Sequence, residues 1–510
     1  MIPASHAVTP LVRGLMAVFI LLLAINVWHH VPWSDELHAW GLALHSATLA
    51  DLFRNLHFEG HPGLWHLILW VASSLTTNPM VMQVVHAAMA VAVILILGLW
   101  APFRPIEKAL LFANYFLVFE YAVLARNYGV ALLLALLYVR LRCADRSRPW
   151  AIALVLGAMG NANVYAFVLS GLLALEFLHH RLLGPRPPQR GDWPGLLGSA
   201  GLYAALMLLS VATLWPDPAI TSFAQQPDTH ARSSPMRLLV QSLRAIVPPF
   251  LPIDFSFPAS FAFPGNIYDH GKRVWFCAAL APAILFALWR IFRSRWDLLA
   301  LIGTCMVVAA GFSFLVYPAA IRHLGIVFIA FVCALWIMRA DAGQLRPSLP
   351  VLALLAMGAL GGAVAQAGQW MRPYAINQQV VDWLRAHDLG GAPIIGFPDI
   401  RIEAVALLMD RPFYALECQC EARYVRLDNR RNDFQPAVIP DRLATAMRRY
   451  GPGPVVLLAG DPVDAAEREA IARLGMRLEE RVHLAGAERD IHMTIFTVTG
   501  MPAPAAPGGR

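Results

Sequence analysis

Long apolar runs recur along the first 370 residues of the chain, and short polar or basic segments separate them. Runs such as 81–100 and 349–367 approach the ~20 residues with which an α-helix crosses the hydrocarbon core of a bilayer. The pattern predicts an α-helical polytopic membrane protein whose eleven spanning helices lie at 11–28, 79–100, 108–124, 128–143, 149–163, 164–180, 195–215, 274–292, 297–316, 321–338 and 348–368.

The connections between these runs differ in their content of basic residues. If the N-terminus is cytoplasmic, the cytoplasmic connections carry Arg104, Lys108, Arg140, Arg142, Arg146, Arg148, Arg181, Arg186, Arg190, Arg290, Arg293, Arg295, Arg339 and Arg346. The short outer connections carry mainly Arg126 and Arg322. Because basic residues concentrate on the cytoplasmic side, this bias selects one orientation, in a bacterial inner or plasma membrane. An odd number of spans then places the C-terminal part outside the cytoplasm.

Two outer segments interrupt the apolar pattern. The outer loop 29–78 mixes acidic and apolar positions, and its stretches Ala39–Leu52 and Gly63–Leu75 are typical of helices lying along the membrane surface. The outer loop 216–273 is rich in proline and aromatic residues. It is either a gate over a site or an ordered plug without a mechanistic role.

After residue 370 the composition changes to that of a small α/β domain. The pattern predicts helices at Asn377–His387 and Ala465–Leu474 and short buried strands at Ala392–Phe397, Pro454–Ala459 and Met493–Val498. We therefore expect a transmembrane domain over 1–370, an extracytoplasmic α/β domain over 371–500 and a disordered tail over 501–510.

Composition supports the membrane assignment and excludes a nucleic-acid partner. Hydrophobic residues make up 58% of the chain and charged residues 14%, against about 45–50% and 25% in soluble domains. The net charge of +7 is the excess that cytoplasmic loops of membrane proteins carry. Cys418 and Cys420 lack the spacing of a redox or zinc motif, and we assign them no chemistry.

Candidate chemistry lies in the first outer loop. The segment WSDELH at 33–38 holds two adjacent carboxylates, Asp35 and Glu36, which are costly at a membrane boundary unless solvated, paired or functional. The alternative is a plain helix start, with Ser34 as its N-cap. The segment HFEGHPGLWH at 57–66 brings three histidines close to Glu59, but its spacing does not match a known metal motif.

Together these two segments resemble the first outer loop of the GT-C membrane glycosyltransferases, which has an acidic pair followed by an acidic residue and His-Pro. The loop is similar to those of protein O-mannosyltransferases and lipid A aminoarabinose transferases. Gly63 stands where those families have a second proline, so the resemblance is to the wider superfamily. Arg126-Asn127-Tyr128 resembles the Arg-x-Tyr of related bacterial sequences. The resemblance in topology covers about residues 10–370.

The resemblance implies that a polyprenyl-phosphate-linked sugar in the outer leaflet is the donor, and that an acceptor hydroxyl attacks its anomeric carbon with inversion. The acceptor is a protein, a lipid or a glycan. Asp35 matches the family's acidic residue and is the expected general base, with Glu36 as a second catalytic candidate. The departing phosphate needs cations. The expected substrate-binding residues are Glu59, His61, Arg126, Tyr128, Tyr317, Arg322 and His323. GT-C members differ in metal dependence, so a divalent metal stays open.

Two other classes of function compete with this interpretation. A transporter or flippase of lipid-linked sugars would place ionisable residues near the bilayer midplane and often show two repeated halves. Here the acidic groups lie in an outer loop and the halves do not resemble each other. A non-catalytic envelope assembly protein would need no acidic pocket. The sequence therefore favours a membrane glycosyltransferase.

Overall fold

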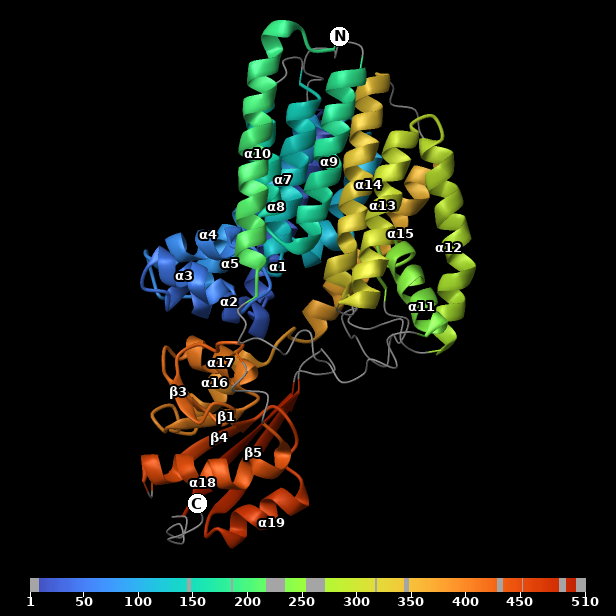
Figure 1. Ribbon diagram of the computed structural model, residues 1–510. Helices are drawn as coiled ribbons and strands as arrows, with labels where there is room; N and C mark the ends of the chain where they lie inside the picture. Colours follow the sequence, from blue (N-terminus) through green and yellow to red (C-terminus); the bar gives the residue numbers. More distant parts are fainter. Residues whose placement is uncertain are drawn as a thin grey trace.

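The computed structural model has a bundle of long helices at one end and a small sheet at the other (Figure 1). The structure describes residues 9–144, 148–184, 187–216, 234–253, 271–316, 319–343, 348–428, 434–451, 453–485 and 492–500, with the backbone alone at 271–273. The predicted tail 501–510, Tyr317 and much of the outer loop 216–273 lie outside these residues. Within that loop the structure describes one helix, α11 (Pro235–Ile246).

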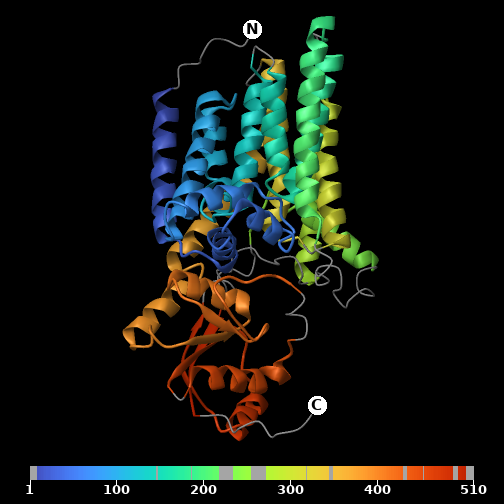
Figure 2. The ribbon, with the colours of Figure 1, turned by 60° about the vertical axis from the view of Figure 1, so that its left-hand side comes forward.

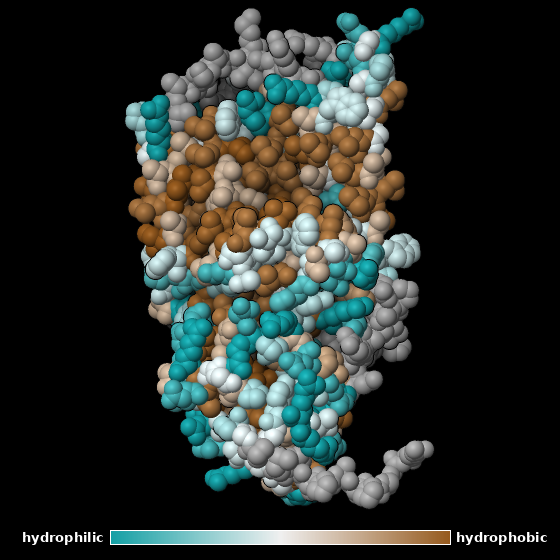
Figure 3. Space-filling view, turned by 90° about the vertical axis from the view of Figure 1, so that its left-hand side faces the viewer, coloured by the Kyte–Doolittle hydropathy of each residue, from teal (hydrophilic) through white to brown (hydrophobic). Residues whose placement is uncertain are grey.

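Eight of the described helices are long and apolar enough to cross a membrane. They are α1 (Pro10–His29), α5 (Met80–Trp100), α9 (Val164–Leu183), α10 (Trp193–Leu214), α12 (Gly271–Phe292), α13 (Trp296–Leu315), α14 (Ile321–Ala342) and α15 (Leu349–Met371). These helices run side by side (Figures 1 and 2). On the face shown in Figure 3, the outward side chains of the bundle form an apolar band with polar residues beyond each of its edges.

Exposed tryptophans mark the two edges of this band. Those at helix ends near the sheet are Trp28, Trp215, Trp275 and Trp370, and those within one turn of the opposite ends are Trp100, Trp150, Trp193, Trp289 and Trp296. Tryptophan is enriched where a bilayer meets water, because its ring is apolar and its N–H is polar. The two girdles confirm the prediction of a polytopic membrane protein.

The three remaining predicted spans are shorter or interrupted. The span expected at 108–124 begins as α6 (Pro105–Phe112) and resumes after a break as the π-helix η1 (Phe116–Glu120). At the break the Asn114 side chain accepts a hydrogen bond from the Phe116 N–H at 3.0 Å. Such a local bond competes with the helical ladder. The spans expected at 128–143 and 149–163 are α7 (Asn127–Arg142) and α8 (Pro149–Gly160).

Helix α14 forms the centre of the bundle, and 89% of its spanning window is buried. A helix that is apolar on every side belongs in such a position. Gly325, in its second turn, leaves room for the rings of Phe116 and Tyr121, which a side chain there would overlap. The close approach brings the start of α14 against the irregular segment that follows η1.

Three short helices cap the bundle at the end that faces the sheet (Figure 2). They are α2 (Ser34–Leu44), α3 (Leu49–Leu56) and α4 (Leu64–Ser73). The helices predicted at 39–52 and 63–75 are present, although the stretch 39–52 is divided between α2 and α3. Helix α3 begins after Thr48, whose hydroxyl caps the helix by accepting a hydrogen bond from the Asp51 N–H at 3.1 Å.

The C-terminal part forms a six-stranded sheet in the order β3-β2-β1-β4-β6-β5. Its strands are β1 (Ile394–Phe397), β2 (Phe413–Ala415), β3 (Cys420–Ala422), β4 (Val455–Ala459), β5 (Arg477–Ala485) and β6 (His492–Thr499). Its helices are α16 (Asn377–Ala386), α17 (Asp399–Leu408), α18 (Ile439–Tyr450) and α19 (Ala465–Arg473). Strand β1 pairs in parallel with β2 and β4, and the other pairs are antiparallel. The five elements predicted from the sequence are confirmed; β2, β3, β5, α17 and α18 were not predicted.

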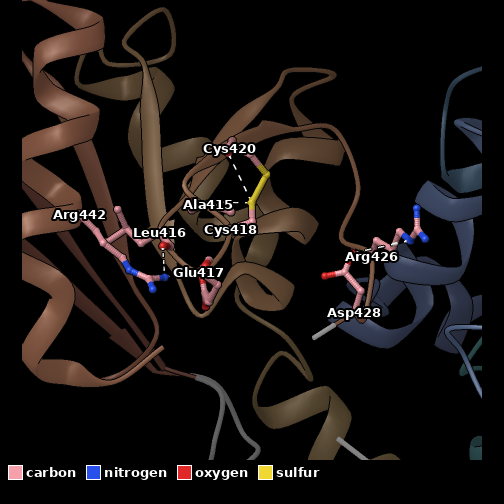
Figure 4. Close-up of a disulfide and its surroundings, with 8 residues drawn as sticks. All are labelled: Ala415, Leu416, Glu417, Cys418, Cys420, Arg426, Asp428 and Arg442. Carbon is pink, nitrogen blue, oxygen red and sulfur yellow. Dashed lines mark hydrogen bonds and ion pairs between the residues drawn. A yellow bond between two sulfur atoms is a disulfide. The ribbon is translucent and has the colours of Figure 1, made fainter. Parts of the chain in front are cut away.

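A disulfide joins Cys418 to Cys420 in the turn between β2 and β3 (Figure 4). The spacing of the two cysteines did not predict this pairing. Beside it, Arg442 donates to the carbonyl oxygens of Leu416 at 2.9 Å and Glu417 at 2.6 Å, which ties the turn to α18. Of the other cysteines, Cys277, Cys305 and Cys333 are buried and unpaired, as expected of core thiols.

The C-terminal α/β region packs against the capping helices through α17 and α2. Leu37 of α2 forms an apolar cluster with Ala404 and Leu407 of α17. Gly41 lets the two helices come close, since a Cβ there would lie 2.8 Å from Leu407 Cδ1. The helix that carries the sequence-predicted acidic pair is therefore held between the bundle and the sheet region.

Candidate active site

The acidic pair opens α2, and the start of this helix fixes where each carboxylate points. Glu36 accepts from the Trp33 N–H at 2.8 Å, which satisfies one of the donors that a helix start leaves free. Helix geometry then turns the neighbouring Asp35 to a different side. The Glu36 side chain is fully buried, whereas 29% of the Asp35 side chain is exposed.

Asp35 lies between two guanidinium groups from distant parts of the chain. Arg126, the N-cap of α7, forms an ion pair and a hydrogen bond with its carboxylate. Arg322, in the first turn of α14, approaches the same carboxylate oxygen at 3.6 Å. Both cations also face the Trp33 ring, with guanidinium carbons 5.5 and 5.2 Å from its centroid. The structure thus gathers one carboxylate, two cations and one aromatic ring.

Backbone contacts hold the two arginines in place. The residue before Arg126, Ala125, donates its N–H to Glu36 Oε1 at 2.6 Å, and the Arg126 carbonyl lies 3.2 Å from His86 Nε2. The Tyr121 hydroxyl donates to the Arg322 carbonyl at 2.5 Å. The irregular segment 121–126 therefore connects α2 to α14. Its Ala125 N–H bonds Glu36 of α2, and its Tyr121 hydroxyl bonds the Arg322 carbonyl of α14.

The charges at this position are unbalanced in favour of cations. Burial of Asp35 opposes ionisation, but the Arg126 and Arg322 guanidinium groups outweigh it and hold the pKa of that carboxyl below its usual 3.8. Asp35 is therefore ionised at neutral pH, and two positive charges face one negative charge. The Arg322 Nε is buried and has no hydrogen-bond partner among the residues that the structure describes. This group can accommodate a further anion.

Glu36 is held in a network of its own. His30 Nε2 lies 2.8 Å from Glu36 Oε2, and the Trp33 and Ala125 N–H groups complete the partners of the carboxylate. Burial raises the pKa of Glu36, but its contacts with His30 and these N–H groups bring the pKa below its usual 4.5. Glu36 thus links α2 to the segment that carries Arg126.

The second acidic segment, between α3 and α4, forms a buried cluster around Glu59. Both oxygens of Glu59 lie 3.0 Å from His38 Nε2. Burial and the nearby Arg126 lower the pKa of His61 to about 4, and burial lowers that of His66 to about 3. Both rings are therefore neutral at neutral pH. Their Nδ1 atoms are buried without a partner in the described part of the chain.

The aromatic candidates form a stack under the two arginines. Tyr128 stacks on Tyr121, with centroids 5.6 Å apart, and lies 5.9 Å from His323. His323 stacks in turn on Tyr165 at 5.0 Å. Its Nδ1 accepts from the Ala320 N–H at 2.9 Å, which caps α14 beside Arg322. Tyr128 and His323 are therefore fixed in one aromatic stack beside the start of α14.

The structure brings Arg126 and Arg322 to the same Asp35 carboxylate, and Tyr128, His323 and His61 lie near both arginines. Glu36 and Glu59 lie in separate histidine networks nearby. Trp33 and His38, which belong to the quoted motif, were not singled out as site residues. No cluster of three or more metal-ligating side chains with suitable geometry occurs among the described residues.

The bundle of spanning helices with an acidic and cationic site at one end, covered by an α/β region, has a fold that is known from GT-C membrane glycosyltransferases. Two crystal structures of ArnT from Cupriavidus metallidurans, a lipid A aminoarabinose transferase, share it. The apo structure is 13% identical, with a TM-score of 0.52 over 94% of this chain and 97% of that one. The structure bound to undecaprenyl phosphate is 14% identical, with a TM-score of 0.51 over 98% of this chain and 99% of that one.

At this sequence identity, the likeness between this chain and the two ArnT structures shows a common fold and nothing further. No protein-family model matches the chain, and no curated protein matches its sequence. The predicted GT-C-like fold is confirmed.

Proposed function

We propose that this protein is a membrane glycosyltransferase that transfers a sugar from a polyprenyl-phosphate donor to an acceptor hydroxyl at the outer face of the membrane, with inversion. The observation that carries the proposal is the contact of Asp35 with Arg126 and Arg322, which come from three separate segments. The undecaprenyl phosphate in one of the ArnT structures supports a lipid phosphate as the ligand of this fold.

The two guanidinium groups are suited to the donor phosphate. A planar guanidinium presents paired N–H donors that match phosphate oxygens. The excess positive charge and the unsatisfied Arg322 Nε provide both attraction and hydrogen bonding. Because phosphate leaves during transfer, cations at this position stabilise the charge that develops in the transition state.

Asp35 would act as the general base. The acceptor oxygen forms a bond to the anomeric carbon, the bond from that carbon to the phosphate oxygen breaks with its electron pair on the phosphate, and the hydroxyl proton passes to Asp35. In the absence of donor the arginines hold the pKa of this carboxyl low, which makes it a weak base. A bound phosphate would compete for both guanidinium groups. The pKa of Asp35 would then rise, so the base gains strength when the donor is in place.

The remaining candidates would support these three residues. Glu36 would hold the segment that carries Arg126, and Glu59 with the neutral His61 would bind sugar or acceptor hydroxyls next to Asp35. Tyr128 and His323 would line the donor site. Tyr317 lies outside the described residues, and its assignment stays a prediction.

We also propose that the site and the C-terminal α/β region face the outside of a bacterial plasma membrane. The arginine-rich connections between spans lie at the end of the bundle opposite to the sheet, as the positive-inside bias requires. The Cys418–Cys420 disulfide supports the same orientation, because disulfides persist outside the reducing cytoplasm.

A topology reporter checks this orientation. Alkaline phosphatase, which is active only outside the cytoplasm, should be active when fused after Arg372, where α15 ends, and inactive when fused after Arg293, where α12 ends. The same two fusions should give the opposite pattern with a reporter that is active only in the cytoplasm. Activity of phosphatase at Arg293 and none at Arg372 would invert the orientation and reject an outer-face site.

The transferase activity is tested by comparing the envelope lipids and glycans of cells with and without the gene by mass spectrometry. We expect the deletion strain to lose a species one sugar heavier than its acceptor, to accumulate the bare acceptor, and to recover the product when the gene is restored. Identical mass profiles in the two strains, with the protein present in the wild-type membrane, would contradict the proposal.

A further inference from the structure

His38 of α2 connects two carboxylates from opposite ends of the sequence. Its Nδ1 lies 2.7 Å from Glu403 Oε2, and its Nε2 lies 3.0 Å from both oxygens of Glu59. The three side chains are 7%, 0% and 5% exposed. Burying ionisable groups is strongly unfavourable unless each is paired and hydrogen-bonded. A row of three such groups across the junction of two parts of the chain therefore needs an explanation.

We propose that Glu403 is a positioning residue of the transfer site, which acts through His38 on Glu59 and on α2, so that the C-terminal α/β region completes the site. The inference rests on the proposed glycosyltransferase function. It gives this region a role within the catalytic unit, in place of a separate binding module.

The surroundings of Glu403 hold its carboxylate rigidly. Its second oxygen, Oε1, accepts from the Val425 N–H at 3.0 Å, so both oxygens have partners. Gly41 allows Oε1 to approach α2, since a Cβ there would lie 3.0 Å from it. The carboxylate is thus a fixed acceptor that sets the orientation of the His38 ring.

The orientation of His38 matters because of its two neighbours in the site. Its far nitrogen holds Glu59, which lies beside His61 and His66. Its backbone belongs to α2, one turn after Asp35, and the charge of His38 acts on that carboxylate. A shift of α2 or of Glu59 would therefore move Asp35 and Glu59, the two groups that the proposed function places at the substrate.

Docking alone does not require these buried charges. Other contacts join the same two surfaces without a buried ion: Arg426 lies over the Phe58 ring at 3.9 Å, and His45 stacks on Tyr424. The apolar cluster of Leu37 with α17 adds to them. The Glu403–His38–Glu59 row is thus additional to the docking interface, and it reaches the site through Glu59 and through α2.

The row predicts a protonated His38. Burial lowers the pKa of His38, but Glu403 and Glu59 outweigh it and raise the pKa well above 6.5; the other charged or titratable groups near the ring are Asp35 and His66. Because the folded-state pKa is raised, the contribution of the row is present at low pH and is lost as pH rises through that pKa.

The test combines the titration of His38 with turnover, in full-length protein in nanodiscs and in cells. Histidine-ring NMR, assigned with His38→Asn, should show wild-type His38 still protonated above neutral pH. In Glu403→Gln the midpoint should fall. The rate of product formation in cells should fall on the order of 10- to 100-fold, the effect of a misplaced reacting group. The affinity for the probe undecaprenyl phosphate should stay unchanged.

Glu421→Gln is the matched control, because Glu421 is a partly exposed carboxylate of the same region that pairs with Arg449 at 2.6 Å. It should leave all three readings at wild-type values. The inference is overturned if Glu403→Gln leaves the titration midpoint of His38 unchanged, or if the wild-type midpoint lies near pH 6.5. Sugar transfer by the wild-type protein would then still support the proposed function. The wild-type titration decides the matter if Glu403→Gln does not fold. If wild-type protein makes no transferred-sugar product, the proposed function fails and Glu403 loses its positioning role, even with a raised midpoint.

Discussion

Replacing Asp35 by asparagine should abolish sugar transfer and leave the protein folded and inserted in the membrane. Asparagine has the same shape but cannot accept the proton of the acceptor hydroxyl, and loss of a general base costs about 10²- to 10⁴-fold in rate. Product formation in a complemented deletion strain and the amount of protein in the membrane measure the two effects.

The same variant should retain its affinity for the lipid phosphate or bind it more tightly. In the wild-type protein the Asp35 carboxylate occupies the two guanidinium groups that the phosphate needs. Asparagine carries no charge to compete with phosphate. A loss of turnover together with a loss of phosphate binding would therefore disagree with a role as base and would indicate a structural role.

Asp51→Asn is the matched control for this substitution. Asp51 lies in the same outer loop, on α3, and its ion pair with Arg54 at 2.9 Å is largely exposed. Exposed pairs contribute little to stability, because solvent and salt screen them. Transfer by Asp51→Asn at the wild-type rate is expected. Transfer by Asp35→Asn at the wild-type rate would show that Asp35 is not the general base.

Replacing Arg126 or Arg322 by glutamine should weaken binding of undecaprenyl phosphate about 10- to 100-fold each. A hydrogen bond to a charged group contributes about 1.5–3 kcal/mol, and about 1.4 kcal/mol corresponds to a tenfold change in affinity. Turnover should fall further than affinity, because the same cations stabilise the departing phosphate. Affinity is measured by thermophoresis of purified protein, and turnover in the complemented strain.

The two arginine variants should not be additive. Both arginines contact the same carboxylate and face the same Trp33 ring, so each variant changes the surroundings of the other cation. Arg54→Gln, which removes an exposed guanidinium from the same outer loop, should bind the lipid like wild type. Wild-type affinity in the Arg126→Gln, Arg322→Gln double variant would show that the phosphate binds elsewhere.

Local patterns in the sequence predicted the elements that depend on nearby residues. The apolar runs mark the spans, and short apolar stretches such as 394–397 and 455–459 mark the central strands, because burial on both faces requires such residues. The break between α6 and η1 was not predicted. Most of the residues around it are apolar or aromatic, and the break depends on how the Asn114 side chain bonds locally and on how α14 packs.

The part of the site that the sequence could not predict depends on contacts between distant segments. The family resemblance pointed to Asp35, and the topology placed Arg126 and Arg322 at outer helix ends, so their meeting could be anticipated. The link from His38 to Glu403 spans 365 positions, and nothing in the sequence around Glu403 distinguishes it from other carboxylates. Partners of that kind are specified only by the packing of α17 on α2.

The position of bound lipid phosphate tests the central claim most directly. We expect a cryo-electron microscopy structure of the full-length protein in nanodiscs with undecaprenyl phosphate to show the phosphate between the guanidinium groups of Arg126 and Arg322, beside Trp33. The Asp35 carboxylate should be released from at least one of them. A phosphate bound away from both arginines, with Asp35 still paired to Arg126, would contradict the proposed site.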